Sequence, residues 1–385
     1  MKVVWTKRIA EKIIETMKMR PVSTMVNALV TSTINSNQIF PEDLKRMREV
    51  ATLMHEQLSE LSIEQIMMLL QVDAIIKSQL QGQNEQRDFF MDMIAGESCI
   101  FDAKEIADNS FMKNIPFAEK VSGDYEYKYI TMKPYELDVF DIPTRVDDIL
   151  IDIPRVGCFT EEFTYPALVQ TSNSKVQMAI TPTFISTMND EIRRARGKVL
   201  TLGLGMGYYA FMVSEKEDVE SVTIIEKEQN VIDLFNEVIL PSIPPGDKIT
   251  VIHSDASEYL SSIDDGLYDY CFADTWTGTE DIEAYFAVKE AAKKFRKMKI
   301  EYRIEEGFAL QLSGNVWIEI LKAFSEAANL NIPNLEVLST EIDRRKENYI
   351  RTMLSGDEIK TPDNIDYYMN PKNIISLIGS SSLIF

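Results

Sequence analysis

The spacing of apolar side chains divides the chain into two parts. Up to about residue 120, apolar residues recur at i, i+3 and i+4, as in PEDLKRMREVATLMHEQLSELSIEQIMMLLQVDAIIKSQL, where Pro41 suits a helix start. Glycine and proline are scarce in this part. The period predicts a helical N-terminal domain over residues 1–122, which opens on an amphipathic helix.

Short apolar and aromatic runs punctuated by proline follow this helical part. Two of them are DYEYKYITM (124–132) and FTYPALVQ (163–170). Runs of this kind are typical of strands, so residues 123–175 are expected to form short strands and a connector. The next segment has helical spacing, with Thr181 at the N-cap position and Pro182 as the first helical residue.

After Gly197 the chain alternates between buried-strand runs and helix-period runs. The strand runs are KVLTLGLG (198–205), VESVTIIEKE (219–228), DKITVIHSDA (247–256) and YDYCFADTW (268–276). Such alternation predicts an α/β fold, a Rossmann-like doubly wound parallel sheet over residues 176–300. Residues 301–385 mix both periods and are expected to complete this core with helix and strand. The pattern leaves open whether they add strands to the sheet.

Composition narrows the choice of partner and location. The net charge of −21 disfavours a nucleic acid, because its phosphates would be repelled by the average surface. No apolar run reaches the roughly 18–20 residues of a membrane span, so no membrane partner is expected. Three separated cysteines form no CxxC pair, which favours a cytoplasmic location, and only two histidines are present, so no metal site is expected.

Three glycines follow the first predicted strand of the sheet. Gly203, Gly205 and Gly207 stand in G-x-G-x-G order at its carboxyl end, the place where ligands bind to open parallel sheets. Missing Cβ atoms would permit a tight turn and the close approach of a ligand to the main chain. A dinucleotide fingerprint would need a glycine where Tyr208 stands, which disfavours NAD(P) and FAD.

Acidic residues mark the ends of the next three predicted strands. Glu226 ends the second strand and can accept hydrogen bonds from ribose hydroxyls. Asp255 and the small Ala256 end the third, where an acid and a small residue suit an adenine ring. Asp274 ends the fourth. Each acid alone could equally cap a helix or hold a loop, but their repetition on successive strand ends favours a ligand site.

These residues together resemble a known family. The stretch from about Gln177 to Lys297 is similar to the class I S-adenosylmethionine-dependent methyltransferases, and most to their spermidine synthase-like branch, through the glycine turn, EKEQNVIDLF, SDASEYL and YDYCFADTW. The branch also lacks an acid two residues before the first glycine, where this chain has Thr201. The resemblance implies S-adenosyl-L-methionine as the cofactor, held by Gln177, Gly203, Gly205, Gly207, Tyr208, Glu226, Asp255 and Ala256.

The resemblance also implies an acceptor side. Asp274 would be the catalytic residue, and Asp274, Thr275 and Trp276 would contact the substrate. Spermidine synthases carry a second acid in this loop where the present chain has Thr277, so that acid is missing or shifted to Glu280 or Asp281. This departure counts against aminopropyl transfer.

Three hypotheses for function follow. The first is methyl transfer to a small acceptor, for which an amine suits the Asp274 carboxylate. The second is aminopropyl or aminocarboxypropyl transfer of the spermidine or nicotianamine synthase type. The third is a non-catalytic cofactor-binding or interaction module. In any of these, the helical N-terminal domain could form the surface of a homodimer.

Overall fold

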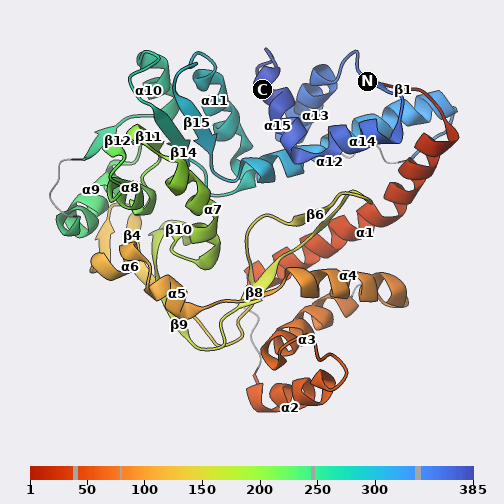
Figure 1. Ribbon diagram of the computed structural model, residues 1–385, viewed down its shortest axis with the longest axis horizontal. Helices are drawn as coiled ribbons and strands as arrows, with labels where there is room; N and C mark the ends of the chain where they lie inside the picture. Colours follow the sequence, from red (N-terminus) through yellow and green to blue (C-terminus); the bar gives the residue numbers. More distant parts are fainter. Residues whose placement is uncertain (38–41, 79, 244–247, 334–339) are drawn as a thin grey trace.

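A computed structural model describes residues 1–37, 42–78, 80–243, 248–333 and 340–385 (Figure 1). The protein is a mixed α/β structure with several sheets and many helices, which confirms the predicted class at that level. Pro41, the expected helix start, lies outside the described residues. None of the helices in the described ranges is both long and apolar enough to cross a membrane.

Helices dominate the N-terminal part, as the apolar spacing predicts. They are α1 (Lys7–Asn37), α2 (Leu44–His55), α3 (Ile63–Lys77), α4 (Asn84–Glu97), α5 (Ala103–Ala107) and α6 (Ser110–Asn114). Ser62 and Gln65 form a reciprocal capping box that fixes the start of α3. Val26, Val30 and Met67 are fully buried in a core shared by α1 and α3. Figure 1 shows α2, α3 and α4 grouped away from the parallel sheet.

A four-stranded antiparallel sheet connects these helices to the rest of the chain. Its order is β10-β9-β4-β3, with β3 (Lys120–Ser122), β4 (Tyr125–Met132), β9 (Phe163–Gln170) and β10 (Lys175–Ala179). The strands predicted at 124–132 and 163–170 are thus confirmed. The remaining short strands form separate small sheets: β2 (Cys99–Ile100), β8 (Val156–Cys158) and β5 (Asp138–Val139) make one, β6 (Thr144–Val146) and β7 (Ile151–Ile153) make another, and β1 (Lys2–Val3) belongs to a third.

The second sheet is parallel throughout, in the order β13-β12-β11-β14-β15. Its strands are β11 (Gly197–Leu202), β12 (Val219–Glu226), β13 (Ile249–His253), β14 (Tyr270–Ala273) and β15 (Lys299–Tyr302). Strands β12 and β13 follow β11 on one side, and β14 and β15 follow on its other side. The order in which the chain adds strands therefore reverses between β11 and β14. Both faces are covered: Leu200 and Cys271 belong to one buried core, and Val199 and Phe272 to another.

Helix α7 (Pro182–Arg194) lies between β10 and β11 and leads into the parallel sheet. The helices between the parallel strands are α8 (Tyr208–Ser214), α9 (Gln229–Leu234) with the π-helix η1 (Phe235–Ile239) and the 3-10 turn η2 (Leu240–Ser242), α10 (Ala256–Ser262), and α11 (Ile282–Ala292), which follows the 3-10 turn η3 (Thr279–Asp281). Helix α7 begins as predicted: Thr181 Oγ1 accepts a hydrogen bond from Phe184 N at 3.2 Å, and Pro182 follows the cap.

The described C-terminal residues are mainly helical. Helices α12 (Glu305–Ala328), α13 (Glu341–Met353), α14 (Pro362–Met369) and α15 (Pro371–Ser380) pack with α1 and α11 into one core, and β16 (Glu358–Ile359) pairs with β1. Only the end of β15 brings residues after 300 into the parallel sheet, as far as the described ranges extend. The chain therefore continues from the sheet into a helical layer.

Other segments of the protein pack closely against the three glycines of the turn after β11. Gly203, Gly205 and Gly207 all have positive φ, at 96°, 53° and 75°. An added Cβ would lie 2.0 Å from the Asp274 carbonyl oxygen at Gly203, 2.3 Å from Met178 Sδ at Gly205 and 2.3 Å from the Phe235 ring at Gly207. The tight turn expected from the missing Cβ atoms is therefore confirmed, and the close approach of a ligand to its main chain stays a prediction. Neighbouring segments fill the space beside the glycines, and only the main chain of the turn is left for a ligand.

Gly207→Ala is expected to destabilise the fold by about 2–5 kcal/mol. A positive φ costs a residue with a Cβ about 1–2 kcal/mol, and forcing the buried Phe235 ring aside adds about 1–3 kcal/mol. Gly314→Ala in α12 is the matched control, since its Cβ would meet nothing within 4 Å and alanine favours a helix. Denaturant unfolding of both variants measures the difference; equal stabilities would contradict this account of the turn.

Candidate functional site

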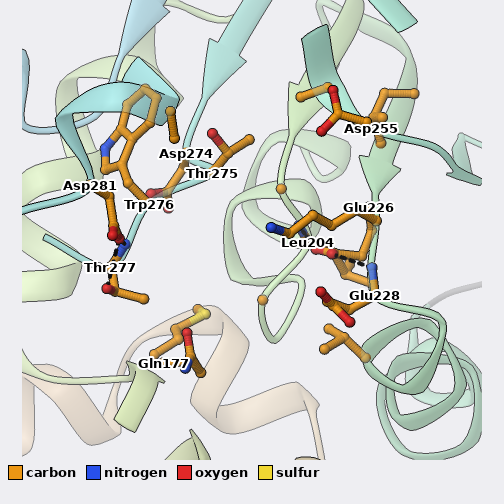
Figure 2. A pocket seen from close by; sticks show the side chains of 18 of the residues that line it. Gln177, Leu204, Glu226, Glu228, Asp255, Asp274, Thr275, Trp276, Thr277 and Asp281 are labelled. Atoms are coloured by element: carbon orange, nitrogen blue, oxygen red, sulfur yellow. Dashed lines mark hydrogen bonds between the residues drawn. The ribbon is translucent and has the colours of Figure 1, made fainter. Parts of the chain in front are cut away.

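A cavity of about 420 Å³ lies where the carboxyl ends of β11, β12, β13 and β14 meet. We call it the main cavity; β4, β9, β10 and α11 close its sides. Figure 2 shows the loop from Asp274 to Asp281 on one side and Glu226, Glu228 and Asp255 on the other, with Leu204 between them. Its lining includes Tyr125, Gln170, Lys175, Gln177, Met178, Gly203, Leu204, Gly205, Glu226, Glu228, Asp255, Ala256, Asp274, Thr275, Trp276, Thr277 and Asp281.

Glu226 links the first two strand ends at this cavity. Its Oε2 accepts a hydrogen bond from Leu204 N at 3.0 Å, and its Oε1 accepts one from Glu228 N at 2.8 Å. The carboxylate thereby fixes the glycine turn relative to the end of β12 (Figure 2). Each oxygen has a further lone pair, so the same group can still accept hydrogen bonds from hydroxyls of a ligand.

Asp255 acts as the N-cap of α10 and also faces the cavity. Its Oδ1 accepts hydrogen bonds from Ser257 N at 2.8 Å, Ser257 Oγ at 2.6 Å and Glu258 N at 3.1 Å. The Ser257 hydroxyl is the main cause that lowers the pKa of Asp255, so the residue is an anion at neutral pH. All three contacts use Oδ1, which leaves Oδ2 as an acceptor for a ligand next to Ala256.

Asp274 forms an ion pair that the sequence did not reveal. Its Oδ1 lies 3.2 Å from a terminal nitrogen of Arg303, the residue that follows β15. The two side chains are 17% and 14% exposed. Burial raises the pKa of Asp274, and the Arg303 charge partly offsets that rise. A cationic acceptor would therefore meet a carboxylate that is already paired.

The loop after Asp274 presents both a hydroxyl group and an aromatic ring to the cavity. Thr275 Oγ1 is buried and has no hydrogen-bond partner among the described residues. Trp276 is 4% exposed, donates from Nε1 to the Arg303 carbonyl at 3.0 Å, and packs edge-on against Phe308. Its ring thus serves loop packing as well as lining the cavity.

Thr277, which stands where the resemblance implies a second acid, is hydrogen-bonded to Asp281. Asp281 Oδ2 accepts hydrogen bonds from Thr277 N at 2.8 Å and from Thr277 Oγ1 at 2.9 Å. Asp281 lines the main cavity, whereas Glu280 is paired with Lys175 at 3.6 Å. Of these two acids, only Asp281 is part of the cavity lining.

The structure gathers most of the predicted residues around one cavity. Gln177 lines it from β10 and donates to Gln170 Oε1 at 3.1 Å. Gly207 and Tyr208 are placed elsewhere. Gly207 packs on Phe235, and Tyr208 is fully buried with its hydroxyl accepting from Asn109 Nδ2 at 2.9 Å.

Two charged residues of the cavity region were missed. Lys175 lies two residues before Gln177 on β10 and lines the main cavity with it, and its Nζ donates to Thr277 Oγ1 at 2.8 Å. Arg303 ends KIEYR, whose alternation marks a fifth strand that could have been treated like the other four. In the described part of the chain, no cluster of three or more His, Cys, Asp or Glu side chains could hold a metal ion.

Comparison with known proteins gives partial likenesses only. No protein-family model matches the sequence, and no curated protein matches it. A spermidine synthase in complex with the transition-state analogue AdoDATO is 18% identical, over 34% of this chain and 45% of that one, with a TM-score of 0.25. The spermidine synthase from Thermotoga maritima is 16% identical, over 33% and 46%, with a TM-score of 0.24. The present chain thus spans less than half the length of either.

A further solved structure is an SAH-bound methyltransferase from Podospora anserina. It is 15% identical, over 46% of this chain and 71% of that one, with a TM-score of 0.30.

Replacing Arg303 by methionine should leave the Asp274 carboxylate without its ion-pair partner and so destabilise the fold. We expect a loss of about 2–4 kcal/mol at pH 7, because a largely buried carboxylate loses its partner. Without Arg303 the pKa of folded Asp274 rises further above its unfolded value, so the loss should shrink as the pH falls from 7 to 5. Unfolding at both pH values measures this. The control is Asp274→Asn/Arg303→Met, which should recover stability at pH 7; a loss independent of both pH and Asp274 would contradict the pairing.

Proposed function

We propose that the parallel sheet is the doubly wound, Rossmann-like sheet of class I methyltransferases and that its main cavity binds S-adenosyl-L-methionine. The observation that carries the proposal is the meeting of Glu226, Asp255 and Asp274 with the Gly203–Gly205 main chain around one cavity at successive strand ends. Ligands of open α/β sheets bind at this edge, where the strand order reverses. Three acids with unrelated local roles would have no reason to face a common space.

The lining fits an adenosyl group chemically. Glu226 would hold the ribose, and Asp255 with Ala256 would meet the adenine. Ile225, Ala256 and Val288 supply apolar surface in the same cavity, as a base requires. The unpartnered Oγ1 of Thr275 adds a hydroxyl that a bound polar group could satisfy.

We propose methyl transfer to a small acceptor as the reaction. The cofactor supplies an electrophilic carbon attached to its sulfonium. The chain's task is then to hold the acceptor in line and to exclude water. Asp274 lies at the rim of β14, and its raised pKa suits a carboxylate that takes a proton from the acceptor while Arg303 holds it in place.

One observation favours aminopropyl-type transfer as a second candidate. Asp281 lines the main cavity four residues after Thr277 and presents a carboxylate on the acceptor side. That placement could replace the acid expected at Thr277. The two reactions leave different by-products, adenosylhomocysteine for methyl transfer and methylthioadenosine for aminopropyl-type transfer.

Binding of adenosylhomocysteine tests the shared premise. Glu226→Gln should weaken binding at least 10-fold, because the amide places donors where the ribose also donates. Glu220→Gln is the matched control, since Glu220 lies on the same strand but is exposed and outside the cavity. Calorimetric titration measures both. If wild type fails to bind, or both variants bind like wild type, the chain is a module of another kind. The by-product formed with a panel of amines and amino acids then separates the two reactions.

A further inference from the structure

The residue that follows Arg303 has an unusual backbone conformation. Ile304 lies between β15 and α12 with φ 51° and ψ 28°, in the left-handed region. Among the described residues other than glycine that have a positive φ, Ile304 alone is branched at Cβ. Branched side chains fit this region least well, and even a simple Cβ disfavours it by a factor of about 5–30. Ile304 therefore holds a strained backbone.

Position 304 also departs from the usual rule for a helix start. Ile304 is the N-cap residue of α12, where Ser, Thr, Asp or Asn normally accepts a hydrogen bond from the first turn. Its side chain supplies no such acceptor and packs against the apolar core instead. Glycine or asparagine would suit this conformation better. Strain of this kind persists only where the surroundings hold it, and it is typical of functional sites.

The loop at the main cavity holds the residue before Ile304. The Arg303 guanidinium pairs with Asp274 Oδ1 at 3.2 Å, and the Arg303 carbonyl accepts a hydrogen bond from Trp276 Nε1 at 3.0 Å. Arg303 thus contacts two lining residues of the main cavity, one through its side chain and one through its main chain. Its direction depends on the backbone of Ile304.

The same loop contacts the residues after Ile304. Phe308 packs edge-on against Trp276 with ring centroids 5.3 Å apart. A Cβ added to Gly307 would lie 3.0 Å from Thr279 Cγ2, so the first turn of α12 lies directly against η3. We call residues 303–308 the clamp, because they contact the 274–281 loop on both sides of the strained residue.

The empty and the occupied site make opposite demands on Asp274. Its side chain is 17% exposed, and a largely buried carboxylate without a partner is strongly unfavourable, so the empty site needs Arg303. An amine acceptor needs the same carboxylate. Breaking the pair is costly, but relaxation of Ile304 offsets the cost by the factor of about 5–30 that its left-handed backbone imposes.

We propose that Ile304 is a positioning residue whose strained backbone makes the Asp274–Arg303 pair easy to open for an amine acceptor. In the closed clamp, Ile304 is left-handed and the pair is intact. In the open clamp, Ile304 relaxes to a negative φ, Arg303 leaves Asp274, and the ammonium group of the acceptor replaces the guanidinium. One cation is exchanged for another, so the carboxylate stays paired. This inference deepens the proposed function and rests on it.

Exchange of the Trp276 indole proton with solvent measures the opening of the clamp. The proton lies in the hydrogen bond to the Arg303 carbonyl, so it exchanges when the clamp opens. The chain has three tryptophans, Trp5, Trp276 and Trp317, so isotope-labelled tryptophan gives three indole signals in an NMR spectrum, and single Trp→Phe variants assign them. Trp317 is the internal control, because it is buried and belongs to the same helix α12 but lies outside the clamp.

Ile304→Gly and Ile304→Ala separate strain from packing. Both lose the isoleucine side chain, but only alanine keeps a Cβ that disfavours the left-handed region. We expect the Trp276 indole proton to exchange about 5–30-fold more slowly in Ile304→Gly than in Ile304→Ala, with Trp317 equal in both. Ile304→Asn should resemble the glycine variant, and it takes its place if the glycine variant does not fold. Equal Trp276 exchange in the glycine, asparagine and alanine variants would overturn the inference.

Amines test what the opening serves. Protein saturated with adenosylhomocysteine is mixed with a panel of primary amines that includes butylamine and 1,4-diaminobutane, with butanol as the uncharged control. At least one amine should speed Trp276 exchange in wild type by roughly 3-fold or more, because it binds the open clamp, and butanol should not. The same amine should bind about 5–30-fold more weakly to Ile304→Gly than to Ile304→Ala. If no amine changes Trp276 exchange, the clamp does not serve an amine acceptor and the inference is overturned.

Binding of adenosylhomocysteine separates this inference from the function on which it rests. Ile304 is not part of the lining of the main cavity, so both variants should bind adenosylhomocysteine like wild type. If wild type binds it and the variants show equal Trp276 exchange, only the inference fails. If wild type does not bind it, the proposed function fails, and the role of Ile304 toward an acceptor fails with it.

Discussion

The turn between β11 and α8 is the constraint on which the site depends. Within the turn, Leu204 N–H donates to the Glu226 carboxylate, which joins the turn to the end of β12. The glycines of the turn let the Asp274 carbonyl, Met178 and Phe235 pack against it. One short segment thereby sets the spacing of strands β11, β12 and β14 at their carboxyl ends. If the turn moved, the acids around the main cavity would no longer face a common space.

The carboxylates around the main cavity fall into two groups that differ in their bonding partners. Glu226 and Asp255 accept hydrogen bonds from main-chain N–H groups, and both line the main cavity. Asp274 is instead paired with Arg303, so the charge at the end of β14 is balanced rather than simply acidic. The net charge of −21 is therefore a poor guide to the acceptor, because the local pair decides which ligand charges are matched.

Much of the fold could be predicted from the sequence, because apolar spacing and proline or glycine punctuation report local structure directly. The four strand runs after Gly197 and the start of α7 at Thr181 and Pro182 are examples. The packing of the three glycines and of Tyr208 could not be predicted in this way. It depends on which groups from distant segments lie against these residues in the folded chain. Arg303 shows the same limit: its pairing with Asp274 joins the ends of adjacent strands that are 29 residues apart in sequence. The alternation of KIEYR marks the strand before it, but the pairing depends on the order of strands in the sheet, which periodicity does not encode.

A crystal structure of the protein grown with adenosylhomocysteine would test the central claim most directly. We expect the ligand in the main cavity, with ribose hydroxyls within hydrogen-bond distance of Glu226 and the base beside Asp255 and Ala256. Density for the ligand at another surface, or none at millimolar concentration while the Gly203–Gly207 turn keeps its conformation, would contradict it.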